Sequence, residues 1–290
     1  MEIRNVQKTG DMHYLYLPTS WCREHKISSK SKVSIEQAGD GTLSISPQIT
    51  ERKLKHLKFN ISEDDQEIIH KLVVACYINP VSSFEINLEK EMDSTKLLNQ
   101  KRLISLESVE IDKKQITSHG SISITDPESL MKTMVKKIKN MILVMQKSYD
   151  KELIDRYEDE IDRSKMLIDK SIISSLTFER TTRAKTIDLY YISLISKDLE
   201  RMVDHLICVS NKESEFLAWL YDAIDCLQGI IENVTSLNHK TALNFIKKVT
   251  KLKPLEIKDV KSYDKERVRL SLTTISEVTI DWAITREVEK

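Results

Sequence analysis

Apolar residues recur at three- and four-residue spacings through most of the second half of the chain, which is the period of one helix face. Five stretches show this spacing: 131–145, 153–172, 180–209, 217–234 and 239–252. The last segment, 265–290, is ambiguous because Val268, Leu270 and Leu272 alternate as they would in a strand. Its position after five helices favours a sixth helix. Antiparallel helices joined by short loops form bundles, so we expect a helical bundle over residues 126–290.

The first 125 residues carry shorter patterns, many of which alternate with a period of two. The alternation around Val33 and Leu43, with Gly-Asp-Gly between them, predicts a hairpin, and residues 19–27 predict one short helix. An amphipathic stripe at 62–77 predicts a helix that Ser62 can cap. Alternation predicts a strand at 83–89 and a further hairpin at 106–125. The sequence therefore predicts a multidomain α+β protein with a β-rich domain over 1–50, a small α/β connecting module over 51–125 and the bundle over 126–290.

Composition narrows the class of protein. Only 5 Gly and 5 Pro among 290 residues favour long helices over a turn-rich β fold. No run of 18 apolar residues occurs, so we expect no membrane insertion, and the polar N-terminus does not resemble a signal peptide. The 4 cysteines lie far apart, which favours reduced thiols in the cytoplasm over disulfides or a thiolate zinc site.

Acidic residues four positions apart stand beside the apolar stripe of three predicted helices. The pairs are Glu158 and Asp162, Glu200 and Asp204, and Glu277 and Asp281. In the first two pairs each acid directly follows a stripe residue, so the acids lie on the same rim of two helices that should pack together. Oxygen ligands of this kind suit Mg, Mn or Fe better than Zn. The alternative is a solvated helix edge whose charge Arg163 or Arg201 neutralises.

The string LERMVDH, Leu199–His205, resembles the signature of the PhoU family of phosphate-signalling regulators. This resemblance implies a bundle of two three-helix units, with acid pairs on two helices of each unit that bind multinuclear metal clusters. The pair Glu158 and Asp162 then matches the second helix, and Glu277 and Asp281 match the sixth. The predicted fifth helix, 239–252, carries lysines in place of an acid pair, so the first unit is the one expected to hold a cluster.

The N-terminal stretch resembles archaeal PhoU-like regulators that begin with an AbrB/SpoVT-like domain. The matching positions are Arg4, Val6, Gln7, Thr9, Gly10, Tyr14, Leu17, Pro18 and Trp21. The resemblance implies a swapped-hairpin, barrel-like domain that forms a homodimer through interlocking strands and contacts DNA through Arg4, Lys8 and Arg23. Residues 1–50 hold six Lys/Arg against five Asp/Glu, a net charge of only +1, and the basic connector RKLKHLK follows at 52–58.

Three classes of function compete. The leading class is a non-enzymatic, cytoplasmic regulator of phosphate uptake or phosphate-responsive transcription, with a carboxylate site for Fe, Mn, Zn or Mg and with DNA and phosphate transporter or sensor components as partners. The second is a metal-free helical adaptor that acts only through protein partners. A carboxylate-bridged metal enzyme ranks last, because such enzymes carry Glu-x-x-His pairs that the predicted helices lack.

Overall fold

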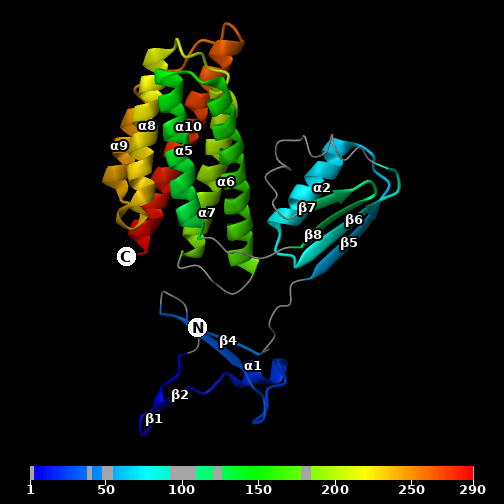
Figure 1. The fold of residues 1–290 in the computed structure, drawn as a ribbon. Coiled ribbons are helices and arrows are strands. Elements are labelled where there is room, and N and C mark those ends of the chain that lie inside the picture. The colour runs from blue at the N-terminus through cyan, green and yellow to red at the C-terminus, as the bar shows by residue number, and fades with distance from the viewer. Residues whose placement is uncertain are drawn as a thin grey trace. The chain divides into compact units, whose positions relative to one another are not determined.

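The computed structural model describes residues 3–37, 41–47, 55–91, 109–119, 126–177 and 184–289 (Figure 1). The chain separates into two compact units, residues 1–53 and 54–290. The described residues are mostly helical, with small sheets and no closed barrel. The expectation of a mixed α+β protein is therefore confirmed, whereas no barrel forms within the described part of one chain.

The first unit consists of two separate two-stranded ribbons and one short helix. The elements are β1 (Gln7–Thr9), β2 (Met12–Tyr14), α1 (Thr19–Glu24), β3 (Ser34–Gln37) and β4 (Leu43–Ser46). Both β1–β2 and β3–β4 are antiparallel pairs. Gly10 has φ +62°, a conformation that suits glycine, and it makes the tight turn between β1 and β2. The short helix and the hairpin around Val33 and Leu43 are both present as expected.

The described residues of the first unit form no hydrophobic core of their own. None of the side chains that the structure describes in 3–35, at 37 and in 41–47 is buried. Eight large apolar side chains are exposed: Ile3, Val6, Met12, Tyr14, Leu15, Tyr16, Ile35 and Leu43. A chain segment that leaves so much apolar surface in water gains little free energy from folding alone.

The second unit begins with a four-stranded sheet covered by one helix. Its elements are β5 (His56–Ile61), α2 (Gln66–Ile78), β6 (Ser83–Leu88), β7 (Val109–Asp112) and β8 (Gln115–His119). The strand order is β5-β6-β8-β7, with β5 and β6 parallel and joined through α2. The stretch 56–58 is thus the start of a strand rather than part of a basic connector. The cap of α2 also differs from expectation, because Asp65, not Ser62, accepts the N–H groups of Glu67 and Ile68.

A helix of the bundle completes the core of this sheet. Buried residues of α2, β6 and β8, among them Val73, Phe84 and Ile116, form one hydrophobic cluster. Met166, which belongs to the bundle helix α6 (Lys151–Thr177), is a buried member of the same cluster. One turn further along α6, the Lys170 ammonium lies 4.0 Å from the centre of the Tyr77 ring on α2. The four-stranded sheet and α2, which we call the sheet module, therefore pack against α6.

The rest of the second unit is a bundle of long helices. Besides α6, its helices are α5 (Pro127–Lys147), α7 (Thr186–Leu206), α8 (Ser214–Glu232), α9 (His239–Val249) and α10 (Val260–Val288), and a short 3-10 turn, η1 (Val234–Ser236), precedes α9. Helix α5 packs against α6 and α8, α7 against α6 and α10, and α9 against α8 and α10. The ambiguous last segment is helical, as expected. The third bundle helix begins at Thr186 rather than near residue 180, and residues 178–183 lie outside the described part of the chain.

Helix α10 forms despite its β-branched residues because its buried positions follow the helical period. Val268, Leu272, Ile275 and Trp282 are fully buried against the neighbouring helices. Asp259 begins the helix with a capping box, since its carboxylate accepts the N–H of Ser262. None of the described helices combines the length and the apolar character needed to cross a membrane.

Candidate metal centre

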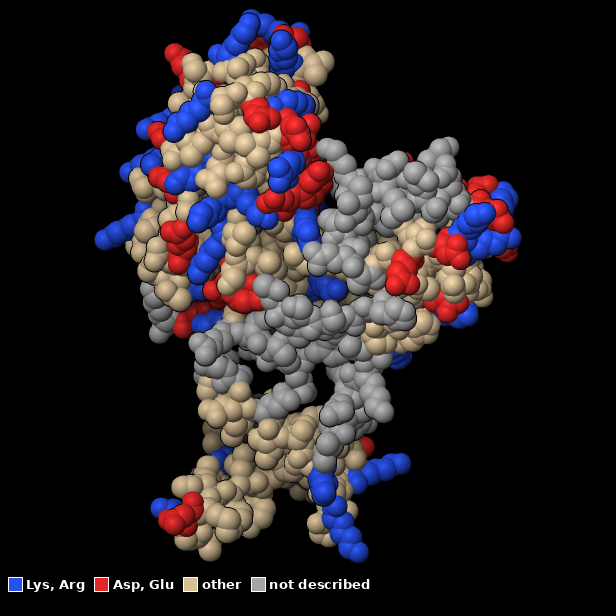
Figure 2. All heavy atoms as spheres, viewed as in Figure 1, with Lys and Arg blue, Asp and Glu red and all other residues tan. Residues whose placement is uncertain are grey.

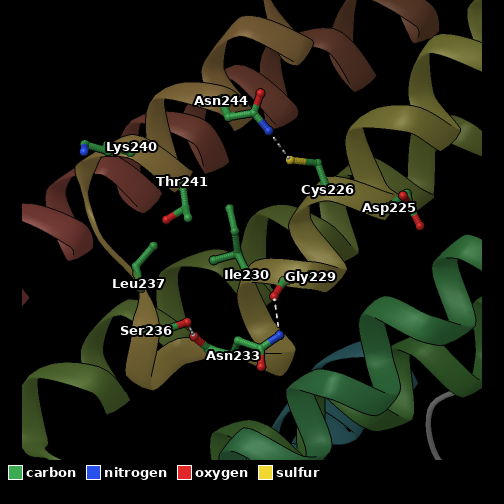
Figure 3. A pocket seen from close by; sticks show the side chains of 10 residues that line it. All are labelled: Asp225, Cys226, Gly229, Ile230, Asn233, Ser236, Leu237, Lys240, Thr241 and Asn244. Carbon is green, nitrogen blue, oxygen red and sulfur yellow. Dashed lines mark hydrogen bonds between the residues drawn. The ribbon is translucent and has the colours of Figure 1, made fainter.

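Acidic side chains gather on one face of the bundle, over α6 (Figure 2). The bundle also contains a cavity of about 390 Å3 on another side, between α8 and α9 (Figure 3). These are two candidate sites, and their chemistry differs.

The cavity between α8 and α9 offers little reactive chemistry. Its lining holds Asp225, Cys226, Gly229, Ile230, Asn233, Ser236, Leu237, Lys240, Thr241 and Asn244. Asp225 is already paired with Lys139 (Nζ–Oδ1 2.5 Å). Burial raises the pKa of the Cys226 thiol, which disfavours the nucleophilic thiolate. Because this lining contains no histidine that could act as a base, the cavity does not resemble an active site.

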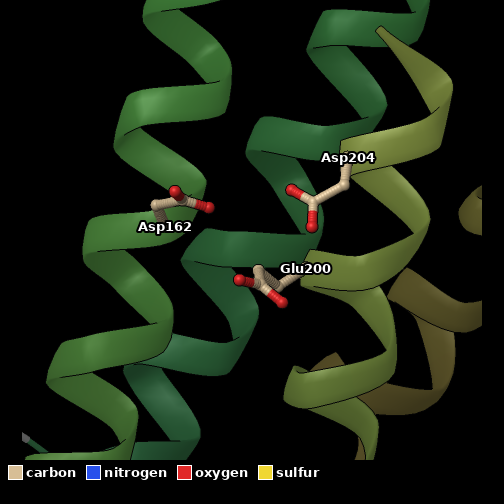
Figure 4. Close-up of side chains that lie close together, drawn as sticks. All are labelled: Asp162, Glu200 and Asp204. Carbon is tan, nitrogen blue, oxygen red and sulfur yellow. The ribbon is translucent and has the colours of Figure 1, made fainter. Parts of the chain in front are cut away.

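The acidic face contains a group of three converging carboxylates. Asp162 of α6 and Glu200 and Asp204 of α7 offer ligand oxygens that all lie within 4.8 Å of one another. In Figure 4, the three carboxylates point toward the space between the two helices. This is the only group of three or more His, Cys, Asp or Glu residues with such geometry among the described residues.

The local sequence explains why these acids meet. Asp162, Glu200 and Asp204 each follow a buried stripe residue, namely Ile161, Leu199 and Val203. On each helix, the acid therefore lies at the rim of the surface that packs against the neighbour. Asp162 and Glu200 are half-buried and Asp204 is exposed. The Asp162 Oδ1 atom is shielded from solvent, so the site is partly withdrawn from water.

The donor set fits a hard or borderline divalent cation. Three carboxylates provide up to six oxygens, and oxygens bound to a common ion at about 2.0–2.6 Å lie about 3–5 Å apart. Carboxylate and water ligation suits Mg²⁺ and Mn²⁺, and Fe²⁺ also accepts carboxylates. Structural Zn²⁺ sites are usually built from Cys and His, and the described group contains neither.

The structure separates the other three predicted ligands from this group. Glu158 lies on α6 one turn before Asp162, half-buried and outside the set of mutually close oxygens. Glu277 and Asp281 are exposed on α10, and the described residues place no third potential ligand close to that pair. Three of the six predicted carboxylates are thus brought together.

Residues next to the group tie α7 to neighbouring elements. His205 Nδ1 lies 2.9 Å from Asp264 Oδ1 of α10, and the His205 ring meets the Tyr263 ring edge-on. His205 therefore packs α7 against α10. Arg201 pairs with Asp198 on the same helix (Nη1–Oδ1 3.6 Å).

A buried clamp holds the opposite end of α7 against α10. The Asp188 carboxylate, which is 2% exposed, accepts a hydrogen bond from Trp282 Nε1 (2.7 Å) and pairs with Arg286 (2.9 Å). The Tyr191 ring stacks on the Trp282 ring with centroids 5.7 Å apart. Sequence reasoning missed this clamp. Its only sequence signal is a charged residue at a stripe position in the first turn of α7.

The residues predicted to contact DNA lie in the first unit. Lys8 is on β1 and Arg23 on α1, and both are exposed. Arg4 precedes β1 and is half-buried.

The chain matches no protein-family model, no curated protein and no solved structure. Its function must therefore be inferred from its own residues and their geometry.

Proposed function

We propose that this protein is a non-enzymatic, cytoplasmic regulator of phosphate uptake or phosphate-responsive signalling of the PhoU type, whose helical bundle holds a divalent metal. One observation carries the proposal: Asp162, Glu200 and Asp204 converge between α6 and α7. Glu200 and Asp204 belong to the string that resembles the PhoU signature. Among the described residues, the group consists of carboxylates alone, and it joins two neighbouring helices, which supports a structural and regulatory role for the metal.

The bound cation would neutralise the three clustered charges and fasten α6 to α7. Like charges this close repel one another, and a shared cation converts that repulsion into attraction. Helix α6 carries the effect further, because Met166, one turn after Asp162, sits in the core of the sheet module. A change in the position of α6 would then reach the module directly. Phosphate transporter or sensor components would bind the bundle in the metal-loaded state.

The first unit would join two copies of the chain. Its described residues include exposed apolar side chains and no buried side chain, which supports the idea that a second copy covers it. Such a homodimer would bring two sets of Arg4, Lys8 and Arg23 to one DNA duplex.

Elemental analysis of the purified full-length protein tests the metal. The protein is incubated with Fe, Mn, Zn or Mg and desalted, and we expect at least one bound ion per chain. Glu200→Gln with Asp204→Asn should lose it. The matched control is Glu277→Gln with Asp281→Asn, which removes an acid pair of the same spacing from α10 and should retain the metal.

Phosphate uptake by cells that lack the gene tests the regulatory role. We expect uptake to lose its response to external phosphate, the control variant to restore it, and the Glu200→Gln/Asp204→Asn variant to fail. If the metal-free variant restores regulation fully, the metal-free adaptor is the correct function instead.

Binding to DNA from the gene's own upstream region tests the role of the first unit. Each phosphate contact on duplex DNA contributes a log–log salt slope of about −0.9, so two or three contacts per protomer give a total of about −4 to −5. Arg4→Ala with Lys8→Ala should flatten this slope. Equal binding by wild type and variant would limit the first unit to dimerisation.

A further inference from the structure

The end of the bundle at which α9 is joined to α10 carries many basic residues, and we call it the basic tip. We define the tip as residues 247–261, which hold six lysines and two acidic residues, a net charge of +4 in a chain whose net charge is zero. The lysines are Lys247, Lys248, Lys251, Lys253, Lys258 and Lys261. Figure 2 shows basic side chains crowded at this end of the bundle, over the segment that joins α9 to α10 in Figure 1.

The two acidic residues of the basic tip leave most of its positive charge uncompensated. Glu256 pairs with Lys258 (2.9 Å), while the Asp259 carboxylate caps α10 by accepting the Ser262 N–H. The remaining lysines include four that are exposed: Lys247, Lys251, Lys253 and Lys261.

Apolar side chains project into solvent among these lysines. Ile257 is 58% exposed and Val260 is 75% exposed. Tyr263, on the first turns of α10, is also exposed. Its ring contact with His205 and the Lys265–Glu213 pair (3.0 Å) place the loop between α7 and α8 at the same end. Isolated aliphatic and tyrosine side chains surrounded by lysines are typical of surfaces that lie in a membrane interface.

We propose that the basic tip docks onto a membrane surface rich in anionic phospholipid. The lysines would lie at the headgroup phosphates while Ile257 and Val260 enter the boundary between headgroups and acyl chains. All six cations are lysines, which act as point charges, whereas recognition of individual phosphates favours the planar fork of arginine. This composition suits a diffuse sheet of negative charge better than an ordered phosphate ligand. The proposal does not depend on the metal centre or on the proposed regulatory function.

Vesicle sedimentation with the full-length protein tests the docking. The vesicles contain either phosphatidylcholine alone or an equimolar mixture with phosphatidylglycerol. We expect binding to the anionic vesicles in dilute buffer, little binding to the neutral ones, and loss of binding in about 0.5 M salt. Lys251→Gln, Lys253→Gln and Lys261→Gln together should weaken binding about a hundredfold, since each lysine near an anionic surface contributes about fivefold.

The matched control removes the same charge elsewhere. Lys136, Lys197 and Lys240 are exposed on α5, α7 and α9, outside the basic tip, and their triple replacement by glutamine should bind like wild type. Replacement of Ile257 and Val260 by serine should also weaken vesicle binding. Three results would overturn the proposal. The first is no binding to anionic vesicles, and the second is an equal loss of binding in both triple variants. The third is vesicle binding that is unchanged by the serine replacements but is abolished by competition with soluble polyglutamate. The last result would identify an acidic protein as the partner.

Discussion

The clamp between α7 and α10 gives a quantitative prediction about what holds the metal-bearing helix in place. Replacing Arg286 by methionine removes the cation beside Asp188 but keeps a side chain of similar length. We expect the free energy of unfolding at pH 7 to fall by about 3 kcal/mol, because loss of one partner from a buried ion pair costs about 3–5 kcal/mol.

The lower end of that range follows from the geometry. The Asp188 side chain is 3% exposed, but the Arg286 side chain is 16% exposed, so water can partly replace the guanidinium. Asp188 also keeps the hydrogen bond from Trp282 Nε1 (2.7 Å). If Asp188 is then changed to asparagine in the same chain, the uncompensated charge disappears while the amide oxygen still accepts the Trp282 bond. The double variant should regain about 1–2 kcal/mol relative to Arg286→Met alone.

Urea unfolding followed by circular dichroism measures these differences. Wild type, both single variants and the double variant form a double-mutant cycle. A loss below about 1 kcal/mol in Arg286→Met, or a double variant less stable than Arg286→Met, would show that the pair does not carry the charge balance inferred from the structure.

Three further predictions concern other parts of the chain. Met166→Ala should lower the free energy of unfolding by about 2–4 kcal/mol, measured by urea unfolding, because it opens a cavity where α6 enters the sheet module. The Lys58 ammonium and, to a lesser degree, the Asn87 amide lower the pKa of Glu85 to about 2, so the stabilisation from Glu85 is present above about pH 4.5 and is lost as pH falls toward 2. Lys58→Met should reduce this acid-side dependence in urea titrations, and an unchanged profile would contradict the pairing. Deletion of residues 1–53 should convert a homodimer into a monomer in light scattering, and a full-length monomer at micromolar concentration would contradict the role of the first unit.

Periodicity predicted most of the bundle because burial of one helix face dominates its sequence. The strand β5 was not predicted, although Leu57, Phe59 and Ile61 alternate, because its first residues were assigned to the basic connector. In the structure Lys58 belongs to the sheet and pairs with Glu85 of the neighbouring strand. The cap of α2 was misplaced because several acidic and hydroxyl residues near its start can all cap a helix, and only the fold selects Asp65.

The sequence predicted only part of the candidate site. A shared rim on two adjacent helices indicated that Asp162, Glu200 and Asp204 could meet, but the sequence does not fix the axial register of α6 against α7. That register leaves Glu158 outside the group. The clamp at Asp188 depends on contacts with residues 94 and 98 positions away, which no local pattern indicates.

Anomalous X-ray scattering from crystals of the full-length protein grown with Mn²⁺ tests the central claim most directly. We predict a manganese peak between α6 and α7 that lies about 2.1–2.3 Å from an oxygen of Asp162, Glu200 and Asp204. A structure in which Mn²⁺ binds elsewhere, or in which these three carboxylates remain without a peak at saturating Mn²⁺, would contradict the metal centre.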